Sequence, residues 1–138
     1  MDLNLDFWRG RSVLVTGHTG FKGSWMCVAL HHLGAHVTGF AQTPITKPAM
    51  FDLVDGAALV DWHILSDIRD ASAVADAVKG AQPDVVIHLA AQPLVLRSYE
   101  GPLSTYETNV MGTVNLFEAI RALGKSIAIV NVTSDKCY

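Results

Sequence analysis

The glycine-rich stretch GHTGFKGS, from Gly17 to Ser24, constrains the fold more than any other part of the sequence. Its glycines recur every third residue, directly after the apolar run SVLVT and directly before the helix-compatible run SWMCVALHHL. Glycine lets a backbone turn tightly and approach a ligand closely, and the N–H groups at the start of a helix favour negative charge. A strand, this turn and a helix in that order predict a cradle for the pyrophosphate of a dinucleotide.

Residue order excludes a mononucleotide-binding Walker A loop. That loop places Lys directly after its second conserved glycine, whereas Lys22 here precedes Gly23. The spacing GxxGxxG also differs from the GxGxxG of many dinucleotide-binding turns, which indicates a subclass. The alternative to a cofactor site is a glycine-rich turn that binds nothing.

Apolar runs and helical patterns alternate along the rest of the chain. The predicted strands are Ser12–Thr16, His36–Ala41, Val60–Leu65, Asp84–Leu89 and Ser126–Val132. The predicted helices are Ser24–Leu33, a short one within 49–56, Ala71–Lys79 between an Asp70 cap and Gly80, and about Pro102–Leu123. Apolar strands without polar alternation, separated by helices, form a parallel sheet covered on both faces. We therefore expect a doubly wound, Rossmann-like α/β fold of about five strands.

Composition limits the classes of function. The chain has 138 residues, half of them hydrophobic, so one core and a single domain over 1–138 are expected. The formal net charge is −3 without a run of Lys or Arg, so nucleic acid is not an expected partner. The sequence shows neither the pattern of a signal peptide nor that of a membrane span, which favours a cytoplasmic location. His32 and His36 have a metal-pair spacing, but Gly34 breaks the helix between them, so no metal site is expected.

Several motifs carry a resemblance to a known family. TGHTGFKGS resembles the TGxxGFxG fingerprint of the extended short-chain dehydrogenase/reductases, and DIRD, HLAAQ, TNVMGT and TSDKCY follow in the order that this superfamily uses. More narrowly, GHTGFKGSW, AAQPLV and SDKCY resemble the CDP-glucose 4,6-dehydratases, in which Lys136 stands where most nucleotide-sugar dehydratases have Glu. The resemblance implies an NAD-dependent lyase of polysaccharide biosynthesis with CDP-glucose as substrate. The apolar stripe of NLFEAIRAL has two interpretations, a homo-oligomer interface, since related enzymes dimerise through helices, and packing of the helix on the sheet.

The resemblance assigns cofactor contacts residue by residue. The matching positions are Gly17, Gly20, Phe21, Lys22 and Gly23 for the pyrophosphate, Asp67 and Ile68 for the adenine, and Leu89, Ala90, Ala91, Gln92 and Thr108 for the ribose and nicotinamide. Asn109 matches a helix asparagine that organises active-site hydrogen bonds. The plain alternatives are a turn residue for Asp67 and a capping or bending role for Asn109.

The resemblance also implies a mechanism of internal redox. In the family, bound NAD+ takes hydride from C4 of the hexose, water leaves across C5 and C6, and the hydride returns to C6. Ser134 matches the residue that hydrogen-bonds the C4 oxygen, Asp135 the acid that protonates the leaving C6 hydroxyl, and Lys136 the position of the C5 base. An ammonium must lose its proton before it can act as a base, so the alternative role of Lys136 is to stabilise the enolate. The plain alternative for all three is a polar turn at a strand end.

One departure from the family pattern concerns the choice of cofactor. NAD-binding domains normally place an acidic residue about 20 residues beyond the glycines, where it binds the ribose 2′-hydroxyl. The second predicted strand runs into GFAQTP, so Gln42 and Thr43 are neutral at that place. NAD is therefore expected from the resemblance alone and NADP stays open, although no arginine follows the strand end to favour it.

The other departure concerns catalysis. The catalytic base of the superfamily is a Tyr followed four residues later by Lys, and no YxxxK pair occurs in this sequence. The resemblance therefore implies the N-terminal part of a dehydratase, a truncated dinucleotide-binding domain without the substrate domain, and we expect the isolated chain to be inactive. Two other interpretations stay open. One is a different extended short-chain enzyme, such as a sugar-nucleotide epimerase or reductase, and the other is a non-catalytic module that binds a dinucleotide or assembles with a partner.

Overall fold

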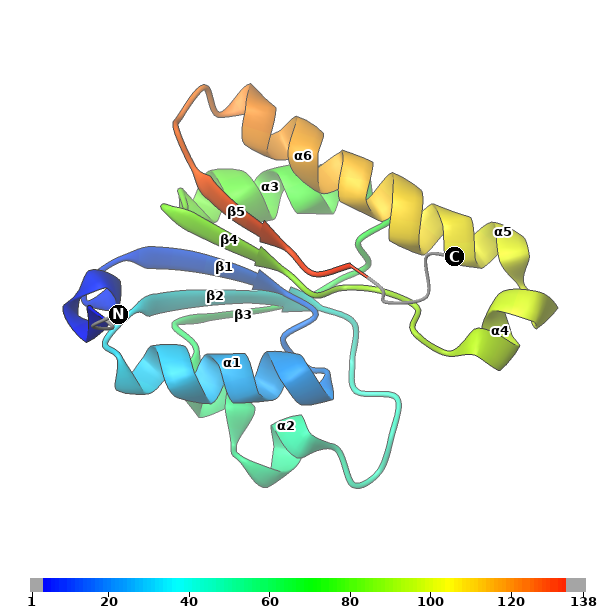
Figure 1. Ribbon diagram of the computed structural model, residues 1–138, viewed down its shortest axis with the longest axis horizontal. Coiled ribbons are helices and arrows are strands. Elements are labelled where there is room, and N and C mark those ends of the chain that lie inside the picture. The colour runs from blue at the N-terminus through cyan, green and yellow to red at the C-terminus, as the bar shows by residue number, and fades with distance from the viewer. Residues whose placement is uncertain (1–3, 134–138) are drawn as a thin grey trace.

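Five parallel strands form the centre of the structure, a computed structural model that describes residues 4–133 (Figure 1). The strands are β1 (Ser12–Thr16), β2 (His36–Ala41), β3 (Trp62–Leu65), β4 (Val85–His88) and β5 (Ala128–Asn131). They lie in the order β3-β2-β1-β4-β5, and every neighbouring pair is parallel. The expected Rossmann-like sheet is thus confirmed. Its strand order reverses at β1, and ligands bind such sheets at the carboxyl ends of the strands around this switch point.

Helices cover both faces of the sheet, as expected. They are α1 (Phe21–His32), α2 (Met50–Leu53), α3 (Ala71–Ala81), α4 (Val95–Glu100), α5 (Pro102–Tyr106) and α6 (Gly112–Ala122). The single turns are the 3-10 helices η1 (Leu5–Trp8) and η2 (Gly56–Leu59) and the π-turn η3 (Glu107–Met111). Figure 1 shows α1 and α2 on one side of the sheet and α3 and α6 on the other. The π-turn joins α5 directly to α6.

Alternate residues of β1 feed two separate hydrophobic cores. Val13 and Val15 pack with Cys27 of α1, whereas Leu14 packs with Leu116 of α6. Each of these side chains is at most 1% exposed. Successive strand residues point to opposite faces, so a strand that is buried on both sides needs an unbroken apolar run. This requirement explains the run SVLVT.

The ends of α3 show one prediction confirmed and one wrong. Asp70 caps the helix, because its carboxylate accepts hydrogen bonds from the backbone N–H groups of Ser72 and Ala73. Gly80 does not end it: α3 continues to Ala81, and Gln82 takes the left-handed position at φ 44°. The side chain and the backbone N–H of Gln82 both donate to carbonyl oxygens of the last helical turn. These bonds satisfy the helix end without glycine.

Other boundaries differ from the sequence-based expectations. Helix α1 begins at Phe21 rather than Ser24, so Gly23 lies inside its first turn. The single helix predicted over about Pro102–Leu123 is instead α5, η3 and α6 in succession. Helix α4 was not predicted, because its surface position gives it no regular apolar face. The predicted strands near β3, β4 and β5 are each shorter in the structure.

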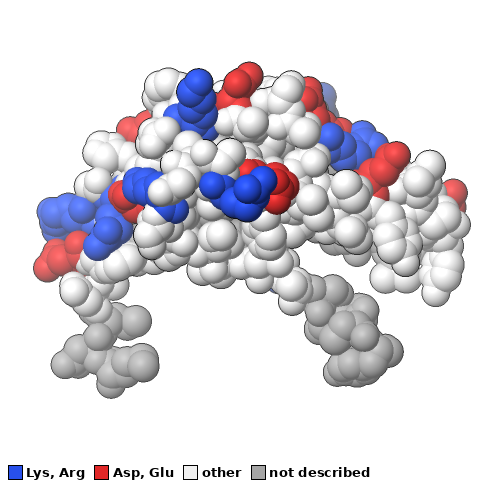
Figure 2. Space-filling model, turned by 90° about the horizontal axis from the view of Figure 1, so that it is seen from above, with Lys and Arg blue, Asp and Glu red and all other residues white. Residues whose placement is uncertain are grey.

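Surface charge is mixed on the face that Figure 2 shows, where Lys and Arg side chains are interspersed with Asp and Glu. Within residues 4–133, no helix combines the length and the hydropathy needed to cross a bilayer.

Candidate dinucleotide site

The glycine-rich turn brings β1 into close contact with the segment after β4. Gly17 has φ +74°, and a Cβ atom there would lie 2.8 Å from the backbone of both Leu89 and Ala90. A Cβ atom on Gly23 would collide with the backbone carbonyl of Gly17. Side chains at either position would therefore destroy the turn. The predicted cradle occupies the switch point of the sheet, and its residues fit a pyrophosphate because the backbone itself forms the surface.

The start of α1 faces this cradle. Gly20 is the N-cap residue and has no side chain to cap the helix. Ser24 donates its hydroxyl to the carbonyl oxygen of Gly20 at 2.8 Å, which leaves the N–H groups of the first turn unaffected. The first N–H groups of a helix have no partner within the helix, and they favour an anion.

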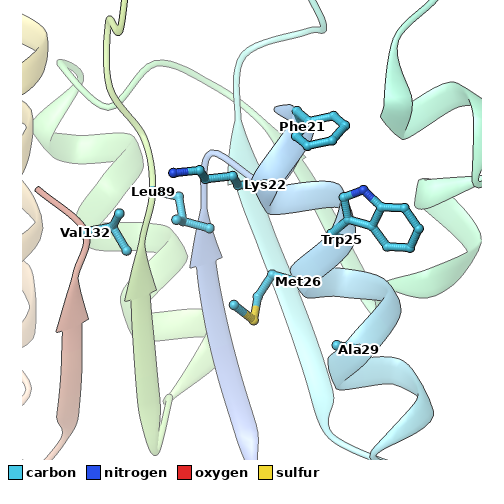
Figure 3. Close-up of a pocket in the computed structure, with 7 residues that line it drawn as sticks. All are labelled: Phe21, Lys22, Trp25, Met26, Ala29, Leu89 and Val132. Carbon is cyan, nitrogen blue, oxygen red and sulfur yellow. The ribbon is translucent and has the colours of Figure 1, made fainter. Parts of the chain in front are cut away.

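A hydrophobic pocket lies beside the turn on the α1 side of the sheet (Figure 3). Its volume is about 390 Å³. It is lined by Phe21, Lys22, Trp25, Met26, Ala29, Leu89 and Val132. In Figure 3 the Lys22 side chain extends across the end of β1 toward Leu89. Lys22 thus places a cation next to the cradle, and the rest of the pocket offers apolar side chains.

A chain of hydrogen bonds fixes the carboxyl ends of β1 and β4. The hydroxyl of Thr16 accepts the N–H groups of Leu89 and Ala90, both at 3.2 Å. Its own proton must therefore go to Nδ1 of His88, 2.6 Å away, so His88 carries its proton on Nε2 and donates it to Thr113 at 3.0 Å. Burial lowers the pKa of His88. A neutral His88 therefore connects the sheet to α6.

Asn109 clamps the segment that follows β4. Its Oδ1 accepts the backbone N–H of Gln92 at 2.7 Å, and its Nδ2 donates to the carbonyl oxygen of Gln92 at 3.1 Å. Asn109 lies in η3, and such π-turns are frequent at functional sites. The hydroxyl of Thr108 instead donates to the carbonyl oxygen of Ser104, one turn earlier in α5. The structure therefore brings 89–92 and Asn109 together, while their contacts with a cofactor stay predictions.

Charged residues surround the predicted adenine position after β3. Asp67 receives hydrogen bonds from the side chains of Gln42 and Arg69, both at 2.6 Å for the shortest contact. The guanidinium of Arg69 holds the pKa of Asp67 below its ordinary value. Ile68 is 5% exposed and packs in the core, and its carbonyl oxygen accepts a bond from Asn115. The sequence predicted no arginine beside the end of β2. The structure shows otherwise, because Asp67 binds both Gln42, which follows β2, and Arg69.

Sequence reasoning missed two groups at this site. Arg69 is within the quoted DIRD motif, yet its pairing with Asp67 depends on the fold of the turn. His18, inside the glycine turn, is fully buried and lies 2.8 Å from His63 of β3 through their ring nitrogens. Phe51 of α2 packs edge-on against His18. A histidine in a turn gives no sequence signal for such burial.

The predicted catalytic residues Ser134, Asp135 and Lys136 lie outside the described residues. Among residues 4–133, no group of three or more His, Cys, Asp or Glu side chains could hold a metal ion.

The sheet order and the glycine turn at its switch point define a Rossmann-like dinucleotide-binding fold. The sequence profile of the GDP-mannose 4,6 dehydratase family matches residues 14–138. The chain therefore belongs to this family of NAD-dependent nucleotide-sugar epimerases and dehydratases, of which it represents an N-terminal portion.

Individual relatives agree with this assignment. The chain is 48% identical over 136 residues to CDP-glucose 4,6-dehydratase of Salmonella typhimurium, an alignment that covers 99% of this chain and 38% of that protein. It is 35% identical over 134 residues to UDP-glucuronate 4-epimerase 1 of Arabidopsis thaliana, covering 94% of this chain and 31% of that protein. The chain thus spans only 31% to 38% of the length of these relatives.

Solved structures share the fold. UDP-glucose-4-epimerase from Stenotrophomonas maltophila, with bound NAD and formylated UDP-arabinopyranose, superposes with a TM-score of 0.77 at 27% identity. The match covers 91% of this chain and 37% of that one. UDP-glucose 4-epimerase of Thermus thermophilus, in complex with NAD, matches with a TM-score of 0.68 at 33% identity, over 81% of this chain and 34% of that one. Structural relatives of this chain therefore bind NAD.

Proposed function

We propose that this chain is the NAD-binding part of a nucleotide-sugar 4,6-dehydratase that acts on CDP-glucose. The observation that carries the proposal is the close approach of Gly17 to the backbone of Leu89 and Ala90. It leaves no space for a side chain on Gly17, at the switch point of the sheet. The similarity to the Salmonella CDP-glucose enzyme and the SDKCY motif favour a dehydratase. A single domain over 1–138, a cytoplasmic location and self-association belong to the same proposal.

The residues of this chain divide into three roles. Gly17, Gly20, Gly23 and Lys22 hold the pyrophosphate through N–H groups and one cation, while Asp67 and Ile68 contact the adenine. The segment 89–92, held by Asn109, supports the ribose and nicotinamide. NAD+ supplies the hydride acceptor when it is bound.

The proposed chemistry lies at residues 134–136, which follow β5. Ser134 donates a hydrogen bond to the C4 oxygen of the hexose, and Asp135 donates the proton that the leaving C6 hydroxyl needs. Lys136 stands at the position of the group that removes the C5 proton, or stabilises the enolate in its charged form. The net result is conversion of CDP-glucose to CDP-4-keto-6-deoxyglucose. Because the sequence has no YxxxK pair, we propose that this chain alone does not complete the reaction.

Calorimetric titration of NAD+ into the chain tests the proposal, and Gly23→Ala supplies the decisive variant. A methyl group at residue 23 collides with the Gly17 carbonyl, so we expect NAD+ binding to fall by at least about tenfold. Gly80→Ala is the matched control, because Gly80 also lies inside a helix, α3, but a Cβ atom there would meet only the Trp62 side chain at an ordinary 3.7 Å. Equal NAD+ affinity in all three proteins would contradict the assignment of the cradle.

Two further candidates keep specific support. The similarity to UDP-glucuronate 4-epimerase favours a related sugar-nucleotide epimerase or reductase. Absence of the YxxxK pair favours a non-catalytic module that binds a dinucleotide or assembles with a partner. A full-length homologue that contains this sequence distinguishes a dehydratase from the epimerase or reductase. Only the dehydratase releases the 4-keto-6-deoxy product from CDP-glucose. Sustained dehydration by the pure 138-residue chain would contradict our expectation that it is inactive alone.

A further inference from the structure

The end of β2 lacks an acidic residue, and the fold brings a carboxylate to that place from the neighbouring strand. Gln42, which directly follows β2, donates from Nε2 to Oδ2 of Asp67 at 2.6 Å. Asp67 comes shortly after β3, which pairs in parallel with β2. NAD-binding domains use an acid at the end of the second strand to bind the ribose 2′-hydroxyl. A negative charge is therefore present at the end of β2 although Gln42 and Thr43 are neutral.

We propose that Asp67 selects NAD+ over NADP+ by supplying this negative charge and by occupying Arg69, the cation that a 2′-phosphate would need. The inference rests on the proposed function, because it requires a dinucleotide bound at the glycine turn. Arg69 directs Nε at 3.0 Å and Nη2 at 2.6 Å to Oδ2 of Asp67. Arginine uses the same N–H donors to bind a phosphate.

The charges around Arg69 reinforce this selection. Asp67, Arg69, Asp70 and Glu107 line one open hollow, in which the carboxylates of Asp67 and Glu107 pair with the guanidinium. Nη1 of Arg69 lies 3.6 Å from Glu107, which occupies the other side of the guanidinium. A 2′-phosphate bound at the end of β2 would bring roughly two negative charges near these carboxylates, whereas a 2′-hydroxyl would bring none. We therefore expect the arrangement to weaken the binding of NADP+ without weakening that of NAD+.

The backbone around Arg69 is held by Asn115 and by Oδ1 of Asp67, which accepts the backbone N–H of Arg69 at 2.9 Å and whose place the amide oxygen of Asn can take. Nδ2 of Asn115, on α6, donates to the carbonyl oxygens of Ile68 and Arg69, both at 3.2 Å. Removing the charge of Asp67 should therefore release the guanidinium without displacing the turn. This separation makes Asp67→Asn an informative variant.

The test is calorimetric titration of the 138-residue chain with NAD+ and with NADP+. The two ligands differ only in the 2′-phosphate, so the ratio of their dissociation constants cancels any change at the adenine. We expect Asp67→Asn to shift this ratio toward NADP+ by at least about tenfold, because a charged hydrogen-bonding group becomes free. Adding Arg69→Gln to Asp67→Asn should reverse the shift. Circular dichroism checks that each variant is folded.

Asp70→Asn is the matched control. Asp70 lines the same hollow and caps α3, and Asn caps helices as well as Asp does. This variant removes one charge but leaves Arg69 bound to Asp67, so the ratio should change by less than about threefold. An unchanged ratio in Asp67→Asn, or an equal shift in Asp70→Asn, would overturn the inference and leave the proposed function standing. Failure of the unaltered chain to bind either dinucleotide would overturn both.

Discussion

At the scale of single residues, His18 shows how the glycine turn depends on a neutral side chain. Its ring is fully buried against Gly39 of β2, where a Cβ atom would overlap the ring. Nε2 of His18 pairs with Nδ1 of His63 at 2.8 Å, so one ring nitrogen of the pair must accept. Protonation of both rings would place two cations at this distance. The turn therefore requires that at least one ring of the pair stays uncharged.

The free energy of unfolding should rise with pH between about 4 and 6.5. Burial and the neighbouring His63 lower the pKa of His18 to about 4 from its ordinary value of 6.5. Within this window the unfolded chain binds a proton that the folded chain does not, so stability is lost as the pH falls below 6.5. The full effect of His18 is about 3 kcal/mol. Urea unfolding at several pH values between about 4.5 and 7.5 measures it.

A pair of variants isolates the contribution of His18 to this pH dependence. His18→Leu should flatten the slope, and the lowered pKa of buried His88 should leave a smaller slope of the same sign. His31→Gln, at an exposed position of α1, should leave the slope unchanged. If His18→Leu and the unaltered chain lose stability equally on acidification, His18 does not carry the effect.

At the scale of elements, the π-turn η3 positions Asn109 toward the segment after β4. Asn109→Ala removes both hydrogen bonds to Gln92. We expect faster hydrogen exchange across residues 89–94 and a loss of about 1–2 kcal/mol of stability. Thr108→Ala is the control, because the Thr108 hydroxyl bonds only the Ser104 carbonyl of the preceding turn in the described structure. Exchange that rises equally in both variants would mean that the helix, rather than the clamp, was disturbed.

The sequence predicts the kinds of elements better than their ends. Apolar runs identify β1 and β2 to the residue, because a strand that is buried on both faces of the sheet is apolar at consecutive positions. Helix ends depend on hydrogen bonds that form only in the fold, such as those of Gln82 beyond α3. The π-turn inside the long helix leaves the apolar pattern nearly intact, so periodicity does not reveal it.

The candidate site divides in the same way. The glycine turn is visible because its geometry demands particular residues at fixed spacing. The pairing of Asp67 with Gln42 and Arg69 joins the ends of two strands, and the link from Thr16 through His88 joins a strand to a helix. Such contacts depend on which strands lie side by side. Sequence motifs therefore locate the site, but the pairing of its charged and polar groups is visible only in the structure.

At the scale of the whole molecule, two of the exposed apolar surfaces of residues 4–133 bear on association. One follows α5, η3 and α6, and its exposed side chains are Leu103, Tyr106, Val110, Val114 and Phe117. Their spacing of three or four residues places them along one side of the helical run. The other is the edge strand β5, where Ile129 and Val130 are 41% and 51% exposed. Exposed apolar stripes and open strand edges both promote association.

We expect the helical stripe, rather than the strand edge, to mediate self-association of the chain. An apolar side of a long helix can pack against a second copy with side chains interlocked, whereas β5 is a short strand of four residues. Sedimentation velocity should therefore show a dimer at micromolar concentrations, and Val110→Glu in the middle of the stripe should dissociate it by placing a charge in the interface. Leu53→Glu is the matched control, since Leu53 is 71% exposed on α2, on the opposite side of the sheet. A dimer that survives Val110→Glu but dissociates on Val130→Lys would instead assign the association to the edge of β5.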